Sequence, residues 1–259
     1  MRFSLRVVPR AGRGVVRPLV RAAVAALALD AAAAAPGHAQ TVRAPDARPT
    51  VAVLNFTNAA MVRTADYAPL SRGMAEMLIT ELAVNPDIRV VERAELQRLL
   101  DEQNLGSSDR VDKETAIRLG KLLGAHHLLM GTFVIDPKEN VRIDVRSVNT
   151  ETSQVEYVES ITGKTERLLP MVGELGTKVN AGLKLPPLPA GRVRPAVAEP
   201  KGPNQFRAMM LMSRALERQD KGDPSSAVSL YKEALMEYPD FTRAKVLLAS
   251  LERPGNPTP

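Results

Sequence analysis

The histidines are the first residues to consider for chemistry, because an imidazole can bind a metal or move a proton near neutral pH. His126 and His127 are the only adjacent pair in the sequence. They open an apolar run typical of a β-strand, in which neighbouring side chains point to opposite faces. They therefore cannot chelate one ion as a helical i, i+4 pair can. We expect a structural role for both and no metal site.

Motifs for covalent catalysis or cofactor binding are missing from the sequence. It has no cysteine, which excludes thiolate nucleophiles, disulfides and zinc–thiolate sites. Dinucleotide and phosphate loops, the serine nucleophile elbow and His-Glu-x-x-His are also absent. Glu92, Arg93 and Glu95 lie where a strand passes into a helix, which suits acids at a helix start; a partner contact is the alternative. We expect no enzymatic activity and no cofactor.

One charge pattern suits recognition of another protein. Apolar and charged residues alternate strictly through residues 140–148, which predicts an antiparallel strand with one wet face. That face could bind a partner through both signs of charge, although a solvated strand face is the plainer interpretation. The candidate partner contacts on this strand and further along the chain are Arg142, Asp144, Arg146, Arg218 and Tyr231.

The positive charge of the chain is concentrated at its N-terminus. Residues 1–40 hold six arginines and one acid, which accounts for five of the six net positive charges. The remainder is close to neutral, so the basic-patch argument for nucleic acid fails. Aromatic residues make up 3% of the chain and tryptophan is absent, which also disfavours base stacking. We expect no nucleic-acid partner.

The N-terminal forty residues have the pattern of a secretory signal peptide. Arginines precede the apolar octet 22–29, and small residues precede Gln40. We predict cleavage after Ala39 and a periplasmic location, with outer-membrane association left open. A mitochondrial presequence or an upstream, non-native start are the alternatives. The octet is shorter than the roughly 20 residues of a membrane span, and without cysteine we expect no lipid anchor.

Hydrophobic periodicity then predicts the elements of an α/β domain. Strands are expected at 50–56 and 88–92, helices at 69–84, 93–103 and 113–123, strands at 127–135, 140–148 and 154–161, and a long helix at 165–183. The segment between the first strand and Asp66 has the composition of a polar loop. The order predicts a mixed sheet, with a parallel β-helix-β-helix start and an antiparallel three-strand meander, packed with helices.

A proline-rich stretch separates this domain from a small all-α module. Residues 186–203 contain six prolines, which favours a stiff, extended linker. Helical patterns resume at Asn204 and are interrupted at Gly222. We predict a signal peptide at 1–39, an α/β domain at 49–185, a linker at 186–203, a helical module at 204–252 and a disordered tail at 253–259.

The α/β segment resembles the curli-secretion (CsgG-like) family of envelope proteins over residues 50–183. The resemblance rests on Val51–Phe56, Gly73–Leu82, Arg89–Leu96, Thr115–Ala125 and Gly131, in matching order and spacing. It implies a periplasmic α/β domain that assembles or binds partners without catalysis. The secretion channel of that family is a lipoprotein with membrane-spanning hairpins. This sequence has neither a cysteine nor extra strands with lipid-facing alternation, so the pore function is not expected here.

The C-terminal module resembles a tetratricopeptide (TPR) repeat. Ala227, Tyr231, Ala234 and Pro239 have the spacing of its second helix and terminating proline, although Arg218 stands where an aromatic residue is usual. One repeat with a capping helix buries too little apolar surface to stand alone. We expect it to dock on another structure.

Together these patterns predict a non-enzymatic periplasmic protein that mediates protein–protein interaction or assembly. The expected partners are other envelope proteins, with self-association left open. The alternative is a ring-forming subunit of an outer-membrane secretion or assembly complex.

Overall fold

A computed structural model describes residues 47–103, 112–189 and 204–253. The predicted signal peptide, most of the predicted linker and all but the first residue of the predicted tail lie outside these ranges. The described residues form one compact unit.

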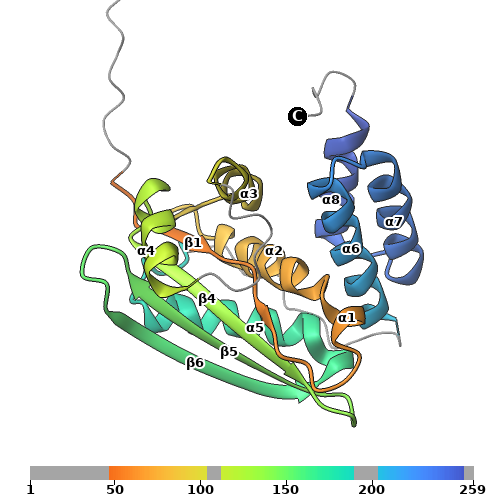
Figure 1. Ribbon diagram of the computed structural model, residues 1–259, viewed down its shortest axis with the longest axis horizontal. Coiled ribbons are helices and arrows are strands. Elements are labelled where there is room, and N and C mark those ends of the chain that lie inside the picture. Colours follow the sequence, from red (N-terminus) through yellow and green to blue (C-terminus); the bar gives the residue numbers. More distant parts are fainter. Residues whose placement is uncertain (1–46, 104–111, 190–203, 254–259) are drawn as a thin grey trace, which may run out of the picture. The chain divides into compact units, whose positions relative to one another are not determined.

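The core of the unit is a six-stranded mixed sheet with the order β3-β1-β4-β5-β6, in which β2 also pairs with β4. β1 is parallel to β3 and β4, whereas β4, β5 and β6 form an antiparallel meander (Figure 1). The mixed α/β fold predicted from the sequence is confirmed. The strands are β1 (Thr50–Val53), β2 (Thr57–Asn58), β3 (Arg89–Val90), β4 (His127–Ile135), β5 (Asn140–Asn149) and β6 (Val155–Lys164).

Burial along the strands follows the sequence patterns. All four residues of β1 are buried, as expected for a strand covered on both faces. In β5, Val141, Ile143 and Val145 are buried while Arg142 and Arg146 are exposed. The alternation at residues 140–148 therefore marks one buried and one wet face, as predicted.

The segment predicted as a polar loop before Asp66 contains two short elements instead. β2 pairs in parallel with the second half of β4, and Ala59 and Met61 donate backbone hydrogen bonds to Phe133 and Ile135. A single helical turn, α1 (Thr64–Tyr67), follows. The loop prediction was wrong because these elements depend on pairing with β4, which local composition does not encode.

Helices cover both faces of the sheet. α2 (Leu70–Ala83) and α5 (Leu168–Gly182), the latter preceded by the 3₁₀ turn η1 (Thr165–Arg167), share the larger core with the inner faces of β4 and β5. α3 (Arg93–Glu102) and α4 (Lys113–Leu122) form a second core with β1 and Leu128. The outer faces of β5 and β6 lie beyond this second core, and their outward residues Arg142, Arg146, Val158, Ser160 and Thr162 are exposed.

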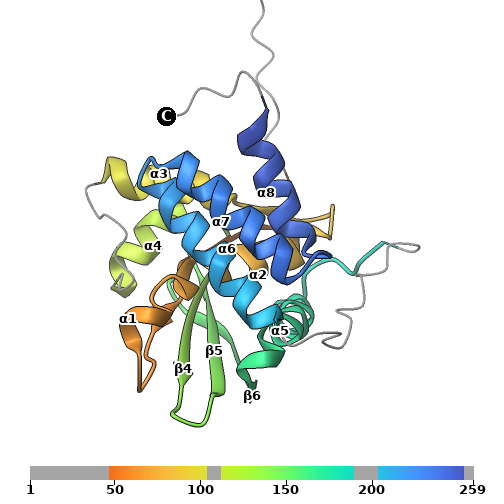
Figure 2. The same cartoon turned by 90° about the vertical axis from the view of Figure 1, so that its right-hand side faces the viewer.

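The C-terminal helices lie side by side next to α2 (Figure 2). They are α6 (Gln205–Asp220), α7 (Pro224–Glu237) and α8 (Thr242–Glu252). Their buried residues belong to the same apolar core as α2 and α5. At the closest approach, a Cβ placed on Gly73 of α2 would lie 1.8 Å from Ser213 Oγ of α6. A glycine is needed here for the two helices to touch.

A second close approach predicts the cost of adding one methyl group to β4. A Cβ on Gly131 would lie 2.2 Å from the ring of Phe56, which is fully buried. Alanine ordinarily suits a strand better than glycine, but the rigid ring cannot move aside without disturbing the core. We expect Gly131→Ala to lower the free energy of unfolding by about 1–3 kcal/mol, measured by urea denaturation.

The matched control removes the ring. In the double variant Phe56→Leu/Gly131→Ala, the loss in free energy of unfolding should be smaller than the sum of the two single losses. The smaller leucine side chain makes room for the new methyl group, and the methyl group fills part of the space left by the ring. Additive losses, or a stability gain from Gly131→Ala alone, would show that the two residues do not clash.

Candidate functional site

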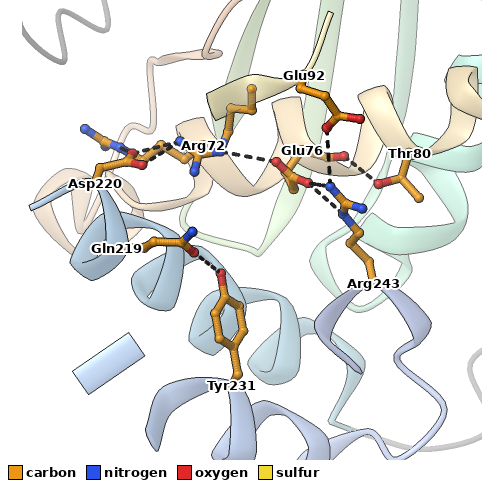
Figure 3. Close-up of polar contacts among 9 residues, drawn as sticks. Arg72, Glu76, Thr80, Glu92, Gln219, Asp220, Tyr231 and Arg243 are labelled. Carbon is orange, nitrogen blue, oxygen red and sulfur yellow. Dashed lines mark hydrogen bonds and ion pairs between the residues drawn. The ribbon is translucent and has the colours of Figure 1, made fainter. Parts of the chain in front are cut away.

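A polar stripe runs along α2 between apolar faces. Arg72, Glu76 and Thr80 are four residues apart and therefore lie on one side of the helix. Such spacing is typical of a solvent-exposed side, yet Arg72 and Glu76 are buried. Thr80 donates its hydroxyl to the backbone carbonyl of Glu76. The two charged residues face α3 and the C-terminal helices (Figure 3).

Two buried carboxylates hold this cluster together. Asp220, the last residue of α6, accepts from Arg72 Nε at 3.1 Å and from Arg93 Nη1 at 2.8 Å to both of its oxygens. Glu76 accepts from Arg93 Nε at 3.2 Å. Arg93, the first residue of α3, therefore links α2 to α6. Its side chain is 6% exposed.

Arg243 of α8 completes the network from the other side. Its Nε donates to Glu76 Oε1 at 2.6 Å, and a second nitrogen of the same guanidinium contacts that oxygen. Glu92 lies 3.9 Å from Arg243 at the exposed rim. We call Arg72, Glu76, Arg93, Asp220 and Arg243 the docking network, because they join α2 and α3 to α6 and α8.

Electrostatics favours the charged form of Arg93. Burial opposes the charge of Arg93, but the neighbouring Asp220 and Glu76 outweigh it and raise the pKa of Arg93 above its ordinary value. Buried charges with satisfied hydrogen bonds give specific geometry, and removal of one partner is costly. The network therefore fixes how the C-terminal helices sit on α2.

The predicted strand-face residues lie together on the wet face of β5. Arg142 makes a bidentate ion pair with Asp144, with nitrogen–oxygen distances of 2.8 and 3.0 Å. Hydrogen bonding from Arg142 lowers the pKa of Asp144, so this carboxylate stays charged. Arg146 is exposed on the same face, opposite Val158 of β6. The face presents a neutral ion pair, one further cation and an exposed valine.

The structure does not bring the other two candidate contacts to this face. Arg218 lies on α6, where its half-exposed side chain is 4.0 Å from Asp223. Tyr231 of α7 is fully buried, and its hydroxyl donates to Gln219 at 3.2 Å (Figure 3). Burial raises the pKa of Tyr231. Its side chain fills the space between α6 and α7 and offers no surface to a second protein.

The histidines have separate partners; His126 lies just before β4, and His127 is the first residue of that strand. The backbone amide of Thr50 donates to His126 Nδ1 at 3.0 Å, and His127 Nδ1 lies 2.7 Å from Glu156. Among the residues that the structure describes, no three histidine, aspartate or glutamate side chains are placed to share a metal ion.

Sequence reasoning missed the docking network. It assigned Arg93 to a helix start and left Arg72, Glu76, Asp220 and Arg243 without a role. The one local signal was the four-residue spacing on α2, which is ordinarily typical of a solvent-exposed side. The partners of Arg72 and Glu76 on α6 and α8 lie more than 120 residues away along the chain, so periodicity could not connect them.

The segment that runs from β1 to the end of β4 matches a known protein family. Residues 32–136 match the family model of the curli production assembly/transport component CsgG. The predicted resemblance to CsgG is confirmed over the described part of this segment. The resemblance of the C-terminal helices to a TPR repeat stays a prediction.

The chain has low similarity to several solved structures. The C-terminal domain of LpoB from Salmonella enterica is 14% identical, with 45% of this chain and 82% of that domain covered and a TM-score of 0.35. Lipoprotein GNA1162 from Neisseria meningitidis is 16% identical, with coverages of 52% and 94% and a TM-score of 0.37. TolB from Acinetobacter baumannii is 11% identical, with coverages of 52% and 28% and a TM-score of 0.36.

No curated protein sequence gives a significant match. Of the helices that the structure describes, none combines the length and apolar character of a bilayer span.

Proposed function

We propose that this chain is a non-enzymatic protein of the periplasm that binds or assembles other envelope proteins through its CsgG-like domain. The observation that carries the proposal is the match of residues 32–136 to an assembly and transport component. The predicted signal peptide would deliver the chain to the periplasm.

In this proposal the C-terminal helices form a TPR-like module that is a fixed part of the protein. The docking network and the shared apolar core hold α6 against α2, so that side of α6 is already occupied. A partner would then bind elsewhere. The wet face of β5, with Arg142, Asp144 and Arg146, is the surface we assign to it.

The proposal is tested in native cells with an epitope-tagged chain. We expect the tag in the periplasmic fraction, and an intact mass that corresponds to a chain beginning at Gln40. Photocrosslinking from a reactive residue at Thr162, beside Arg142 on the neighbouring strand, should capture an envelope protein.

Charge reversal supplies the matched comparison for that capture. Arg146→Glu should reduce the crosslinked product at least about fivefold, since rim charges govern association. Arg214→Glu, which reverses an exposed cation on α6, should leave it unchanged. Cytosolic fractionation would contradict the proposed location, and equal loss in both variants would remove the role of the β5 face.

The second candidate is a ring-forming subunit of an outer-membrane secretion complex, because residues 32–136 match a family of assembly and transport components. Sedimentation of the mature chain distinguishes the two. A monomer or dimer supports the interaction protein, whereas a larger closed oligomer supports the ring.

A further inference from the structure

Among the strands that the structure describes, β6 is long and pairs with a neighbour along one edge only. It spans ten residues and pairs with β5 on one side, whereas the strand at the opposite edge, β3, has two residues. A long open edge carries unpaired backbone groups that can pair with another chain. Val155 and Val158 are also 47% and 65% exposed, so the strand presents apolar surface next to its free edge.

The register shows which backbone groups point to that edge. The backbone amide of Thr165 donates to the carbonyl of Glu139, on the side of β6 that pairs with β5. The backbone amide of Ser160 instead donates to the side chain of Glu159. Residues opposite each other in an antiparallel pair alternate between hydrogen-bonded and non-hydrogen-bonded positions. The backbone groups of Val158, Ser160 and Thr162 therefore point away from β5.

A carboxylate lies over the middle of this edge. Glu159 accepts from the Ser160 amide at 3.2 Å, from the Tyr157 hydroxyl at 2.8 Å and from Lys178 Nζ of α5 at 3.3 Å. Glu174 also contacts Lys178, at 3.4 Å. Two carboxylates thus share one ammonium group, which leaves the edge with a local excess of negative charge.

We propose that β6 accepts an extended, basic segment of a partner protein as an added strand, with Glu159 selecting the basic side chain. The incoming backbone would replace Glu159 at the Ser160 amide and bond to Val158 and Thr162. Apolar side chains of the segment would cover Val158 on the outer face. Lysine or arginine side chains on the other face would meet Glu159 and Glu174. This inference rests on the proposed function, because it specifies how the partner binds.

The test uses the purified mature chain and two labelled decapeptides, one alternating valine with lysine and one alternating valine with glutamate. Fluorescence anisotropy should show the valine–lysine peptide binding at least about tenfold more tightly, because only it complements the acidic edge. Amide exchange at Val158, Ser160 and Thr162 should slow when this peptide is bound. Glu159→Gln should reduce the preference for lysine over glutamate.

A matched pair of substitutions at one position isolates the backbone contact. Val158→Pro removes an edge donor without touching the ladder to β5, as prolines on edge strands do, and should weaken binding of the valine–lysine peptide about tenfold or more. Val158→Thr keeps the donor and should change binding about threefold or less. If Val158→Pro does not fold, amide exchange of the wild-type chain with bound peptide tests the backbone contact on its own.

Three results would overturn strand addition. They are equal binding of the two peptides, binding without slowed exchange at the three edge amides, and self-association of the free chain through β6 in sedimentation. The peptide measurement needs no cells, so its failure can be distinguished from failure of the proposed function. If an envelope protein is captured but the peptide does not bind, the proposed function is supported and strand addition at β6 is rejected.

Discussion

Asp220→Ala is expected to lower the free energy of unfolding by about 3–5 kcal/mol, the loss typical of a buried ion pair deprived of one partner. The carboxylate of Asp220 binds Arg72 and Arg93, whose side chains are 7% and 6% exposed. Without Asp220, Arg72 loses its acceptor in this network and Arg93 keeps only Glu76. Water cannot compensate for this loss unless α6 moves away from α2.

Denaturant unfolding of the mature chain measures this effect, and native-state amide exchange shows where it acts. Exchange should rise first in α6, α7 and α8, because the docking network secures them. Glu252→Ala is the matched control: Glu252 pairs with Lys232 on the surface, at side-chain exposures of 47% and 57%, and should change stability by about 0.5 kcal/mol or less. A loss below about 1 kcal/mol for Asp220→Ala would show that the network contributes geometry but little stability.

Separation of the C-terminal helices from the rest of the chain should have a still larger effect on their folding. Residues 204–253 expressed alone should be largely unfolded or self-associated, because three short helices by themselves bury too little apolar surface to offset their ordering entropy. The buried residues Ala208, Met209 and Met212 of α6 would lose the core that they share with α2. Asp220 and Arg243 would lose their partners.

Circular dichroism with sedimentation tests the isolated fragment. Addition of a second fragment, residues 47–189, should restore helical signal, because it supplies Glu76, Arg93 and the α2 surface. Within the intact chain, Ala227→Leu should cost about 1–3 kcal/mol by overpacking a buried helix crossing. A cooperative, monomeric fragment 204–253 would show that docking on α2 is dispensable for its fold.

Strand and helix positions followed from local patterns because burial imposes a period on the sequence. β5 was predictable from strict alternation, and α4 from hydrophobic periodicity. In the structure the carboxylate of Asp112 also accepts the backbone amides of Glu114 and Thr115 as an N-cap of α4. The three-strand meander followed from short turns between apolar runs. These signals lie within about ten residues of each other, which is the range over which periodicity is informative.

Local sequence patterns placed some of the candidate partner contacts correctly but not others. Arg142, Asp144 and Arg146 were identifiable because a half-buried strand separates its charged residues from its apolar ones. Tyr231 was placed among the candidate contacts, yet it lies in the core, because a tyrosine in a helix can face either solvent or a neighbouring helix. Only the position of α6 over α7 decides between them.

The sequence by itself determined the order of the longer elements, the mixed sheet and the segment that matches CsgG, and it predicts that the C-terminal helices need a docking surface. The tertiary structure alone decided that α2 supplies this surface. It also turned Arg72 and Glu76 from an apparent solvent stripe into buried ion-pair partners of Asp220 and Arg243. The physical reason is that a charged side chain in water interacts only weakly with any single opposite charge. The pairing becomes specific once the fold removes water from both groups. Packing over more than 120 residues of chain makes that choice.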